Sequence, residues 1–289
     1  MAITPDTPDT YTVDTGTVQL IPDGYTKDGW ILFLNGVASS HVVIGDPLHL
    51  DFEYMRWMAA VITEFVSAHL NPQKLRVTHL GGGACSMARY LAAHYPRSRN
   101  TVVEIDGQMA QLVRELFDIP RSPTVKIRVG EAREVTESFV NNSRDIIIRD
   151  VFAGKITPEP LRTVEFLTHC KRSLAPGGLY IANCADGSAL QGAKSELASM
   201  AKVFEHLAVI ADPQMLKGRR YGNIVLAASD APLPTGNAAA ALTRSILNGS
   251  LPAQYHTGNW VERFYSGAQP LFDGELSHPS QPSSGHNLW

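Results

Sequence analysis

Short apolar runs separated by turn residues occupy positions 16–47. They predict three strands, Thr17–Ile21, Trp30–Leu34 and Val37–Ile44. Asn35-Gly36 joins the last two, and this dipeptide is the strongest two-residue signal for a tight hairpin. From Asp51 to Leu70 the apolar positions change to helical spacing. The first part of the chain is therefore expected to form a small antiparallel β-meander followed by a helix.

After residue 75, short apolar runs alternate with helix-like segments. The runs that predict strands are Leu75–Leu80, Thr101–Ile105, Val125–Val129, Asp145–Arg149, Leu179–Asn183, Leu207–Ile210 and Ile224–Ala228. The run at Asp145–Arg149 is almost continuously apolar, which is typical of a strand buried on both faces. Alternation of strands and helices predicts an α/β fold with a parallel, doubly wound sheet.

This pattern divides the chain into four parts. Residues 1–15 are rich in Pro, Thr and Asp and are expected to be disordered. Residues 16–47 hold the β-meander, and residues 48–230 hold the doubly wound domain. Residues 231–289 form a less regular C-terminal extension, with one helical stretch near Ala239–Leu247 and a final segment expected to be mobile.

The composition, 44% hydrophobic and 18% charged over 289 residues, is that of an ordinary globular protein. A net charge of -3 gives no reason to expect a nucleic-acid or membrane partner. Cys85, Cys170 and Cys184 are scattered without a CxxC pair, which favours a reducing compartment over a disulfide framework or a structural zinc site. The N-terminus lacks the features of a signal peptide, and no apolar run approaches the roughly 18 residues that span a bilayer. A cytoplasmic location is expected.

The segment Leu75–Asp106 has the pattern of a βαβ unit that binds a nucleoside. Three consecutive glycines, Gly81, Gly82 and Gly83, follow its first apolar run, and Glu104 ends the second. Glycines let backbone N–H groups approach a ligand closely, and an acid at the end of the second strand can bridge two ribose hydroxyls. The separation of roughly 20 residues matches that arrangement, although tight turns also use glycine with no ligand present.

Further polar residues follow the predicted strands, at the edge where an open α/β sheet binds its ligand. Glu131 follows the third strand. Asp150 follows the fourth directly, so its carboxylate is expected to project into the cleft. Alternatively, Asp150 caps the next helix or pairs with Arg149 or Arg162. His79, inside the first strand, is expected to be a packed core histidine.

An ordered set of motifs runs through the chain: DPLHLDFEYMRWM, LRVTHLGGG, VVEID, VGEAR, DIIIRDVFAG, EFLTHCKRSLAPGGLY and RRYGNIVLAAS. Over residues 17–229 this set resembles the spermidine synthase (polyamine aminopropyltransferase) family, and most closely the spermidine-synthase-like proteins of actinobacteria. The resemblance implies a Rossmann-like, class I S-adenosylmethionine-methyltransferase-type doubly wound sheet with a small N-terminal antiparallel β-domain, in a homodimer. It also implies transfer of an aminopropyl group from decarboxylated S-adenosylmethionine to the polyamine putrescine, which yields spermidine and methylthioadenosine.

The matching motifs imply roles for individual residues. Glu104 matches the acid that holds the ribose, and Glu131 with Ala132 matches the adenine contact. Asp150 matches the catalytic aspartate that orients and deprotonates the attacking amine, and Tyr54 matches a tyrosine of the amine site. The implied donor-binding residues are Gly81, Gly82, Gly83, Glu104, Ile105, Glu131, Ala132 and Asp150. The implied substrate-binding residues are Tyr54, Asp150, Arg219 and Tyr221.

Four positions depart from the family pattern. Ala84 stands where an aspartate binds the donor's ammonium group, and Ala153 where a second aspartate binds the amine substrate. Met55 replaces a glutamine, and Arg219 lies near the place of a further tyrosine. An alkylammonium, with a pKa of about 10, needs carboxylates to bind it and to take a proton. The candidate substitutes are Asp51, Glu53 and Asp186.

The implied reaction is an SN2 displacement beside a sulfonium, which is already a good leaving group, so no metal is expected. Two alternatives stay open. One is an S-adenosylmethionine-dependent methyltransferase, because Ala84 removes an acid that would repel the methionine carboxylate, and Arg219 or Arg220 is available to pair with that carboxylate. The other is a non-catalytic adenosyl-binding protein with a degraded amine site.

Overall fold

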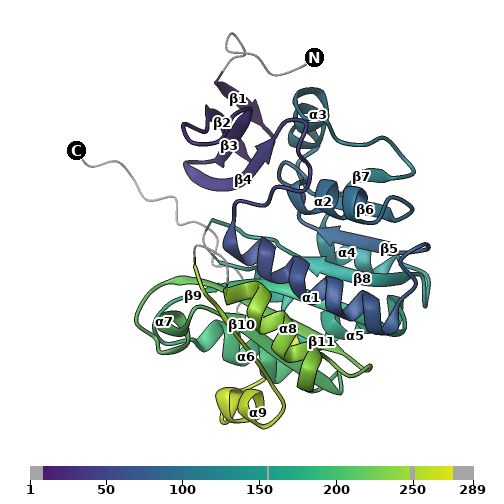
Figure 1. Ribbon diagram of the computed structural model, residues 1–289, viewed down its shortest axis with the longest axis vertical. Helices are drawn as coiled ribbons and strands as arrows, with labels where there is room; N and C mark the ends of the chain where they lie inside the picture. The colour runs from purple at the N-terminus through teal and green to yellow at the C-terminus, as the bar shows by residue number, and fades with distance from the viewer. Residues whose placement is uncertain (1–8, 155, 248–250, 276–289) are drawn as a thin grey trace.

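The N-terminal part of the chain forms a four-stranded antiparallel sheet (Figure 1) in the computed structural model, which describes residues 9–154, 156–247 and 251–275. Its strands are β1 (Thr10–Val13), β2 (Gly16–Pro22), β3 (Gly29–Leu34) and β4 (Val37–Val43), paired in that order. Between β3 and β4, Asn35 and Gly36 have positive φ angles of 51° and 78°, as a type I′ turn requires. The predicted meander and its hairpin are confirmed.

Strand β1 lies within the segment that the sequence predicts to be disordered. That prediction is wrong for Thr10–Val13, which pair with β2 from Thr10 opposite Gln19 to Val13 opposite Gly16. Thr15 adds a long-range anchor, because its N–H and its hydroxyl each donate to Asp106 Oδ2 at 2.7 Å. Residues 1–8 lie outside the described part of the chain.

An eight-stranded sheet forms the centre of the molecule. Its strands are β5 (Arg76–Leu80), β6 (Arg99–Glu104), β7 (Val125–Val129), β8 (Arg144–Arg149), β9 (Leu174–Asp186), β10 (His206–Ala211), β11 (Gly222–Ser229) and β12 (Gln254–Thr257). They lie in the order β12-β10-β11-β9-β8-β5-β6-β7. Strands β9, β8, β5, β6 and β7 are parallel, as predicted. The chain runs outward from β5 through β6 and β7 and then returns to β8 on the other side of β5, so the strand order reverses between β5 and β8.

The opposite edge of this sheet departs from the predicted parallel arrangement. Strand β11 is antiparallel to both β9 and β10, and β12 is antiparallel to β10. The connection from β10 to β11 covers residues 212–221 and holds only the short helix α7 (Pro213–Leu216). A parallel crossover needs about a dozen residues or more. A connection as short as this one therefore leads to antiparallel pairing.

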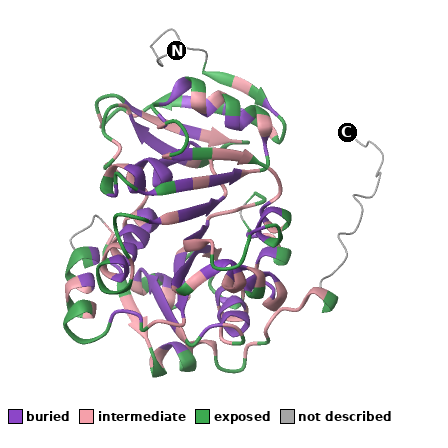
Figure 2. Ribbon diagram, turned by 90° about the vertical axis from the view of Figure 1, so that its right-hand side faces the viewer, coloured by how far each residue is buried: buried purple, intermediate pink, exposed green. Residues whose placement is uncertain are grey.

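Helices cover both faces of the large sheet, as a doubly wound fold requires (Figure 1). One face carries α1 (Glu53–His69), α2 (Ser86–His94) and α8 (Gly236–Leu247); the other carries α4 (Ala132–Glu137), the 3-10 turn η1 (Glu159–Leu161), α5 (Val164–Ser173), α6 (Gln191–Met200) and α9 (Asn259–Tyr265). In β8, Ile146 and Ile148 join the first core and Ile147 the second, because side chains alternate along a strand. The strands of the large sheet are mostly buried (Figure 2). No helix in the described part of the chain is both long and apolar enough to cross a membrane.

A third core joins the N-terminal sheet to the rest of the molecule. Leu20 of β2 and Val42 of β4 pack there with Ala88 of α2 and Val113 of α3 (Gly107–Leu116). The N-terminal sheet therefore rests on α2 and α3, beside the turn that leads from β5 into α2.

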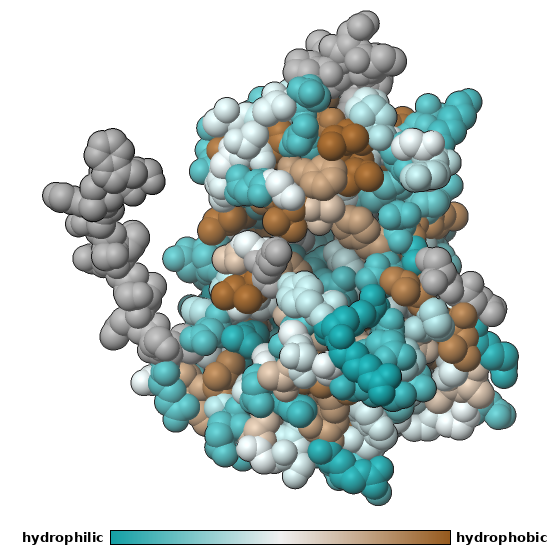
Figure 3. Space-filling model, turned by 90° about the vertical axis from the view of Figure 1, so that its left-hand side faces the viewer, coloured by the Kyte–Doolittle hydropathy of each residue, from teal (hydrophilic) through white to brown (hydrophobic). Residues whose placement is uncertain are grey.

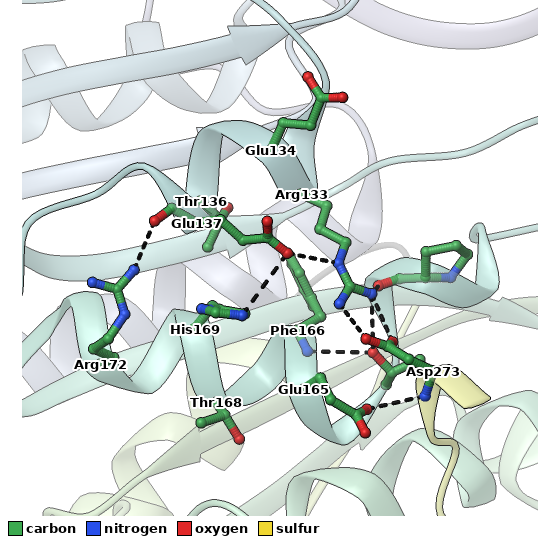
Figure 4. A network of polar contacts seen from close by, with 12 residues as sticks. Arg133, Glu134, Thr136, Glu137, Glu165, Phe166, Thr168, His169, Arg172 and Asp273 are labelled. Atoms are coloured by element: carbon green, nitrogen blue, oxygen red, sulfur yellow. Dashed lines mark hydrogen bonds and ion pairs between the residues drawn. The ribbon is translucent and has the colours of Figure 1, made fainter. Parts of the chain in front are cut away.

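Residues 231–275 are more regular than the sequence pattern predicts. Helix α8, which includes the predicted helical stretch, packs on α1, whereas β12 and α9 were not predicted. In the turn η2 (Asp273–Glu275), the Asp273 carboxylate accepts hydrogen bonds from both terminal nitrogens of Arg133, one of them at 2.7 Å (Figure 4). The Asp273 N–H donates to Glu165 Oε2 at 3.1 Å. These contacts hold η2 against α4 and α5; the segment predicted to be mobile, from residue 276 onward, lies outside the described residues.

Candidate active site

Two loops meet where the strand order of the large sheet reverses. The glycine turn follows β5, and Asp150 follows β8, its parallel neighbour. The Asp150 N–H donates to the Leu80 carbonyl at 2.8 Å and so extends the pairing of the two strands. Open α/β sheets bind their ligands outside the carboxyl ends of the strands at such a reversal.

Gly81 is required by the chain that passes beside it. Its φ is +88°, and a Cβ added there would lie 2.2 Å from the Asp150 carbonyl oxygen. Only glycine tolerates both the left-handed backbone and this approach. The first glycine therefore serves to bring the Asp150 loop close to the turn.

The other two glycines are tied to Glu104. The N–H groups of Gly82 and Gly83 donate to Glu104 Oε2 at 3.0 and 3.3 Å, and the Asp106 N–H donates to Oε1 at 3.1 Å. The structure thus brings together the glycine turn and the acid that the sequence predicts to share one nucleoside site. The carboxylate is held in place by three backbone donors while its side chain stays partly exposed.

Asp150 has two side-chain hydrogen-bond donors from different elements. The Tyr54 hydroxyl, on α1, donates to Oδ2 at 2.8 Å. The Asn183 amide, on β9, donates to Oδ1 at 3.1 Å. Tyr54 and Asn183 are buried, whereas Asp150 is partly buried. Two donors from rigid elements fix the direction in which the carboxylate points.

The same surroundings adjust the acidity of the pair. Burial raises the pKa of Asp150 above its ordinary value, while the hydrogen bonds from Asn183 and Tyr54 and the charge of Arg149 work in the opposite direction. Burial, followed by the charge of Asp150, raises the pKa of the Tyr54 hydroxyl well above its ordinary value. Tyr54 therefore remains a donor, and Asp150 is a carboxylate with increased affinity for a proton, which suits a general base.

A buried ion pair supports this arrangement through Arg149, the residue before Asp150. Arg149 pairs with Glu196, and neither side chain is exposed to solvent. Arg149 Nη1 also donates to the Asn183 carbonyl at 2.7 Å and to Thr157 Oγ1 at 2.8 Å. Arg149 therefore pairs with Glu196, and the alternative of a direct ion pair between Arg149 and Asp150 is wrong. The sequence pattern indicated no role for Asn183 or Glu196. For Asn183, the available signal was a polar side chain in an otherwise apolar run.

A small pocket of about 30 Å³ lies between these groups and α1. Its lining includes Met55, Met58, Gly81, Gly82, His79 and Asp150. His79 is buried, its Nε2 lies 3.0 Å from Asn100 Oδ1, and burial lowers its pKa to about 4. It is therefore uncharged, and the prediction of a packed core histidine is confirmed.

The remaining residues predicted to bind the donor lie at the next two strand ends. Glu131 caps α4, because its Oε2 accepts from the Glu134 N–H at 2.9 Å. Ala132 is buried, and Ile105 is 60% exposed at the end of β6. The Gly130 N–H donates to the Glu104 carbonyl at 2.9 Å, which keeps this loop beside the predicted ribose site. Adenine contact by Glu131 and Ala132, and donor binding by Ile105, stay predictions.

The predicted substrate residues at the start of β11 are less enclosed. Arg219 is exposed and donates to Gln214 Oε1 at 3.2 Å, and Tyr221 is 53% exposed. Arg220 pairs with Asp212 at 2.5 Å. The structure therefore brings Tyr54 and Asp150 together and leaves Arg219 and Tyr221 on the outer part of the connection into β11.

The two alanines that replace family aspartates lie in different surroundings. Ala84 is completely buried in the core beneath the N-terminal sheet, and its N–H donates to Ser40 Oγ at 2.9 Å. Ala153 is exposed in the loop after β8, where it pairs with Ile156. Neither position presents a polar side chain to an amine.

Of the three acids considered as substitutes, Glu53 lies nearest to the Tyr54–Asp150 pair. Its charge contributes to the raised pKa of Tyr54, and its Oε1 accepts from Asn223 Nδ2 at 3.3 Å. The Asp186 carboxylate instead accepts from the N–H groups of residues 187 and 193, at the start of α6. Asp51 lies near two histidines.

Comparison with known proteins identifies a family to which the chain is similar. A sequence model of the spermine/spermidine synthase domain matches residues 57–221, more than half of the chain. The crystal structure of a probable spermidine synthase from Corynebacterium glutamicum is 59% identical, with a TM-score of 0.90, over 94% of this chain and 98% of that chain. The resemblance to actinobacterial spermidine-synthase-like proteins is thereby confirmed.

Two further proteins bear on activity and fold. The polyamine aminopropyltransferase of Vibrio vulnificus is 33% identical over 114 residues, which are 39% of this chain and 38% of that relative's length. Human methyltransferase-like protein 13 is 21% identical, with a TM-score of 0.56, over 78% of this chain and 97% of that chain, a likeness of fold alone. The class I methyltransferase-type sheet is confirmed, and the chain belongs to the spermine/spermidine synthase family.

Proposed function

We propose that the protein transfers the aminopropyl group of decarboxylated S-adenosylmethionine to an amine such as putrescine. The observation that carries this proposal is the contact between the Tyr54 hydroxyl and the Asp150 carboxylate, at 2.8 Å, beside the glycine turn. A base held between two rigid elements next to a nucleoside site is what amine alkylation needs. Membership of the spermine/spermidine synthase family supports the same reaction.

In this proposal Asp150 binds the ammonium group of the incoming amine and takes one of its protons. The freed nitrogen lone pair attacks the carbon next to the sulfonium, the C–S bond breaks, and methylthioadenosine leaves with the bonding electrons. Burial raises the pKa of Asp150, which favours proton acceptance. The methionines of α1 that line the pocket limit access of water.

Glu104 and the glycine turn would hold the adenosyl part of the donor. The Glu104 carboxylate is already fixed by the N–H groups of Gly82, Gly83 and Asp106, so it is oriented before a ribose arrives. Such preorganisation lowers the entropic cost of binding. Glu131 and Ala132, at the neighbouring strand end, would contact the adenine.

Putrescine carries a second ammonium group, for which position 153 supplies no carboxylate. Glu53 takes that role in our proposal, because it is partly exposed and is adjacent to Tyr54 at the start of α1. A charge-assisted contact of this kind contributes about 1.5–3 kcal/mol, or roughly one to two powers of ten in affinity.

The test measures methylthioadenosine release from decarboxylated S-adenosylmethionine and putrescine by liquid chromatography. Asp150→Asn is expected to lower kcat by about 10²–10⁴-fold, since the base is lost. Glu53→Gln is expected to raise KM for putrescine about tenfold. Glu64→Gln provides the matched control, because Glu64 is also partly exposed and lies further along α1. Glu64→Gln should match the parent protein. The amine site is wrongly placed if Asp150→Asn keeps the parent's kcat and Glu53→Gln keeps the parent's KM for putrescine.

Calorimetry distinguishes the donor. We expect decarboxylated S-adenosylmethionine and methylthioadenosine to bind more tightly than intact S-adenosylmethionine. Glu104→Ala is expected to weaken all three alike, by about tenfold or more, because a charged hydrogen-bond partner of the ribose is lost. Tight binding of the intact form alone, or methylthioadenosine binding without turnover of any amine, would overturn the proposed reaction.

A homodimer is part of the same proposal. Apolar side chains gather on the upper part of the face in Figure 3, over the N-terminal sheet. In that sheet Ile21 and Val37 are 38% and 37% exposed. A molar mass of twice 31.5 kDa in light scattering is expected; a single 31.5 kDa species at micromolar concentration would count against the dimer.

A further inference from the structure

Three potential metal ligands converge beside the N-terminal sheet. His41 lies on β4, while His49 and Asp51 lie on the connection from β4 to α1. One ligand atom from each of the three lies within 4.8 Å of the others. The site is built by the end of the N-terminal sheet and by the segment that leads to Tyr54.

His41 is oriented as metal-bound histidines are. It is only 4% exposed, and its Nε2 lies 3.0 Å from Asp23 Oδ2. A carboxylate oxygen accepts hydrogen bonds, so Nε2 carries the hydrogen in this contact and the lone pair lies on Nδ1. A carboxylate on the far ring nitrogen is the usual support for a metal ligand.

One ring nitrogen of each histidine is buried without a hydrogen-bond partner in the described part of the chain. Among the described residues, neither His41 Nδ1 nor His49 Nε2 has a hydrogen-bond partner, and both atoms are buried. The two rings lie with centroids 5.5 Å apart at 45°. A buried polar atom left unpaired costs about 1–3 kcal/mol, so two such atoms on neighbouring rings indicate a missing ligand.

The third potential ligand is the Asp51 carboxylate, at the surface of the protein. The backbone around Asp51 is held in place, because Arg56 Nη1 donates to the Leu50 carbonyl at 2.8 Å and to the Asp51 carbonyl. The Asp51 side chain is exposed, so an ion has a path of entry from solvent.

We propose that His41 Nδ1, His49 Nε2 and the Asp51 carboxylate bind one Zn²⁺ ion, with water as the fourth ligand. Two imidazoles and a carboxylate suit zinc, whereas Mg²⁺ and Ca²⁺ prefer oxygen alone. The scattered cysteines gave no reason to expect zinc, because this site uses no thiolate. The proposal does not depend on the amine chemistry.

The ion would tie together three parts of the proposed active site. The residue before His41, Ser40, accepts from the Ala84 N–H of the glycine turn at 2.9 Å, and the His41 carbonyl accepts from Ser86 Oγ at 2.8 Å. At the other end, Asp51 stands three positions before Tyr54. Zinc would therefore be structural and would fix the connection between the N-terminal sheet and α1.

The test uses the full-length chain, freed of metal with EDTA and titrated with ZnCl₂ by calorimetry and with CoCl₂ by visible absorption. We expect one Zn²⁺ per chain with a micromolar or lower Kd, cobalt bands of four-coordinate type, and a Tm that rises with zinc concentration. His49→Ala and Asp51→Asn are expected to weaken binding by about 100-fold or more. Asp23→Asn, which alters the support of His41, is expected to weaken zinc binding by about 10- to 100-fold.

His169→Ala is the control, because His169 is a partly exposed histidine on α5. Its zinc affinity should equal that of the parent chain. His49 is the principal test position, since it is less buried than His41 and its loss should leave the fold intact. Absence of zinc binding by the parent chain overturns the proposal, and so does binding that His49→Ala leaves unchanged.

Discussion

Replacement of Gly81 by alanine tests the packing on which the proposed active site depends. Gly81 has φ +88°, and a Cβ there would lie 2.2 Å from the Asp150 carbonyl oxygen and 2.9 Å from its carbonyl carbon. Real Cβ atoms essentially never approach another heavy atom closer than 3.0 Å. The Asp150 peptide must therefore move by about 0.8 Å, the difference between 3.0 and 2.2 Å.

Two effects follow from that displacement. A left-handed backbone costs a residue with a Cβ about 1–2 kcal/mol, and loss of the Asp150–Leu80 hydrogen bond adds about 1 kcal/mol, so the free energy of unfolding should fall by about 2–3 kcal/mol. Misplacement of a catalytic group by about 1 Å costs roughly 10²-fold in rate. We expect kcat/KM for putrescine to fall by about that factor.

The assay combines methylthioadenosine release with urea denaturation followed by circular dichroism. Gly24→Ala is the control, because a Cβ at Gly24 meets nothing within 4 Å and the backbone there is not left-handed. It should match the parent chain in both measurements. If Gly81→Ala keeps its rate within about threefold of the parent and unfolds at the same urea concentration, the reasoning from this contact is refuted.

Three further results are expected. Tyr54→Phe removes a hydrogen bond that favours the charged form of Asp150, so the pKa of Asp150 rises and the acidic limb of the kcat/KM profile moves to higher pH; an unmoved limb would contradict its role as base. Ala84→Asp buries a charge, so we expect the free energy of unfolding to fall by about 3 kcal/mol or more, with no gain in activity; a stable, faster variant would contradict this. Asp273→Ala breaks a partly exposed pair with Arg133, so global stability should change by less than about 1 kcal/mol while limited proteolysis cuts sooner near η2; unchanged cleavage would show that the pair anchors nothing.

The sequence predicted strands and helices wherever apolar residues recur at regular spacing along the chain. Short apolar runs separated by turn residues placed the meander, and apolar runs that alternate with helix-like segments placed the parallel strands. The polar residues that follow the runs, Glu104 and Asp150, had to reach one edge of the sheet, because parallel strands all end there. Order in Thr10–Val13 was missed because these residues gain their hydrogen bonds only from pairing with β2.

Within the site, the sequence by itself determined which chemistry each strand end offers: glycines after β5, an acid after β6 and an acid after β8. Only the tertiary structure decided which groups touch. It set Tyr54 and Asn183 on opposite oxygens of Asp150, paired Arg149 with Glu196, and buried Ala84 away from solvent.

The same division separates the glycine turn from the proposed zinc site. The turn is a local motif, whose spacing within one βαβ unit already predicts its place beside Glu104. His41, His49 and Asp51 carry no such spacing signal, because they converge only when the connection after β4 brings His49 and Asp51 close to His41. Local hydrophobic periodicity determines the helices and strands, whereas contacts between distant residues depend on how these elements pack. Among the described residues, it is this packing that buries His41 Nδ1 and His49 Nε2 without a hydrogen-bond partner.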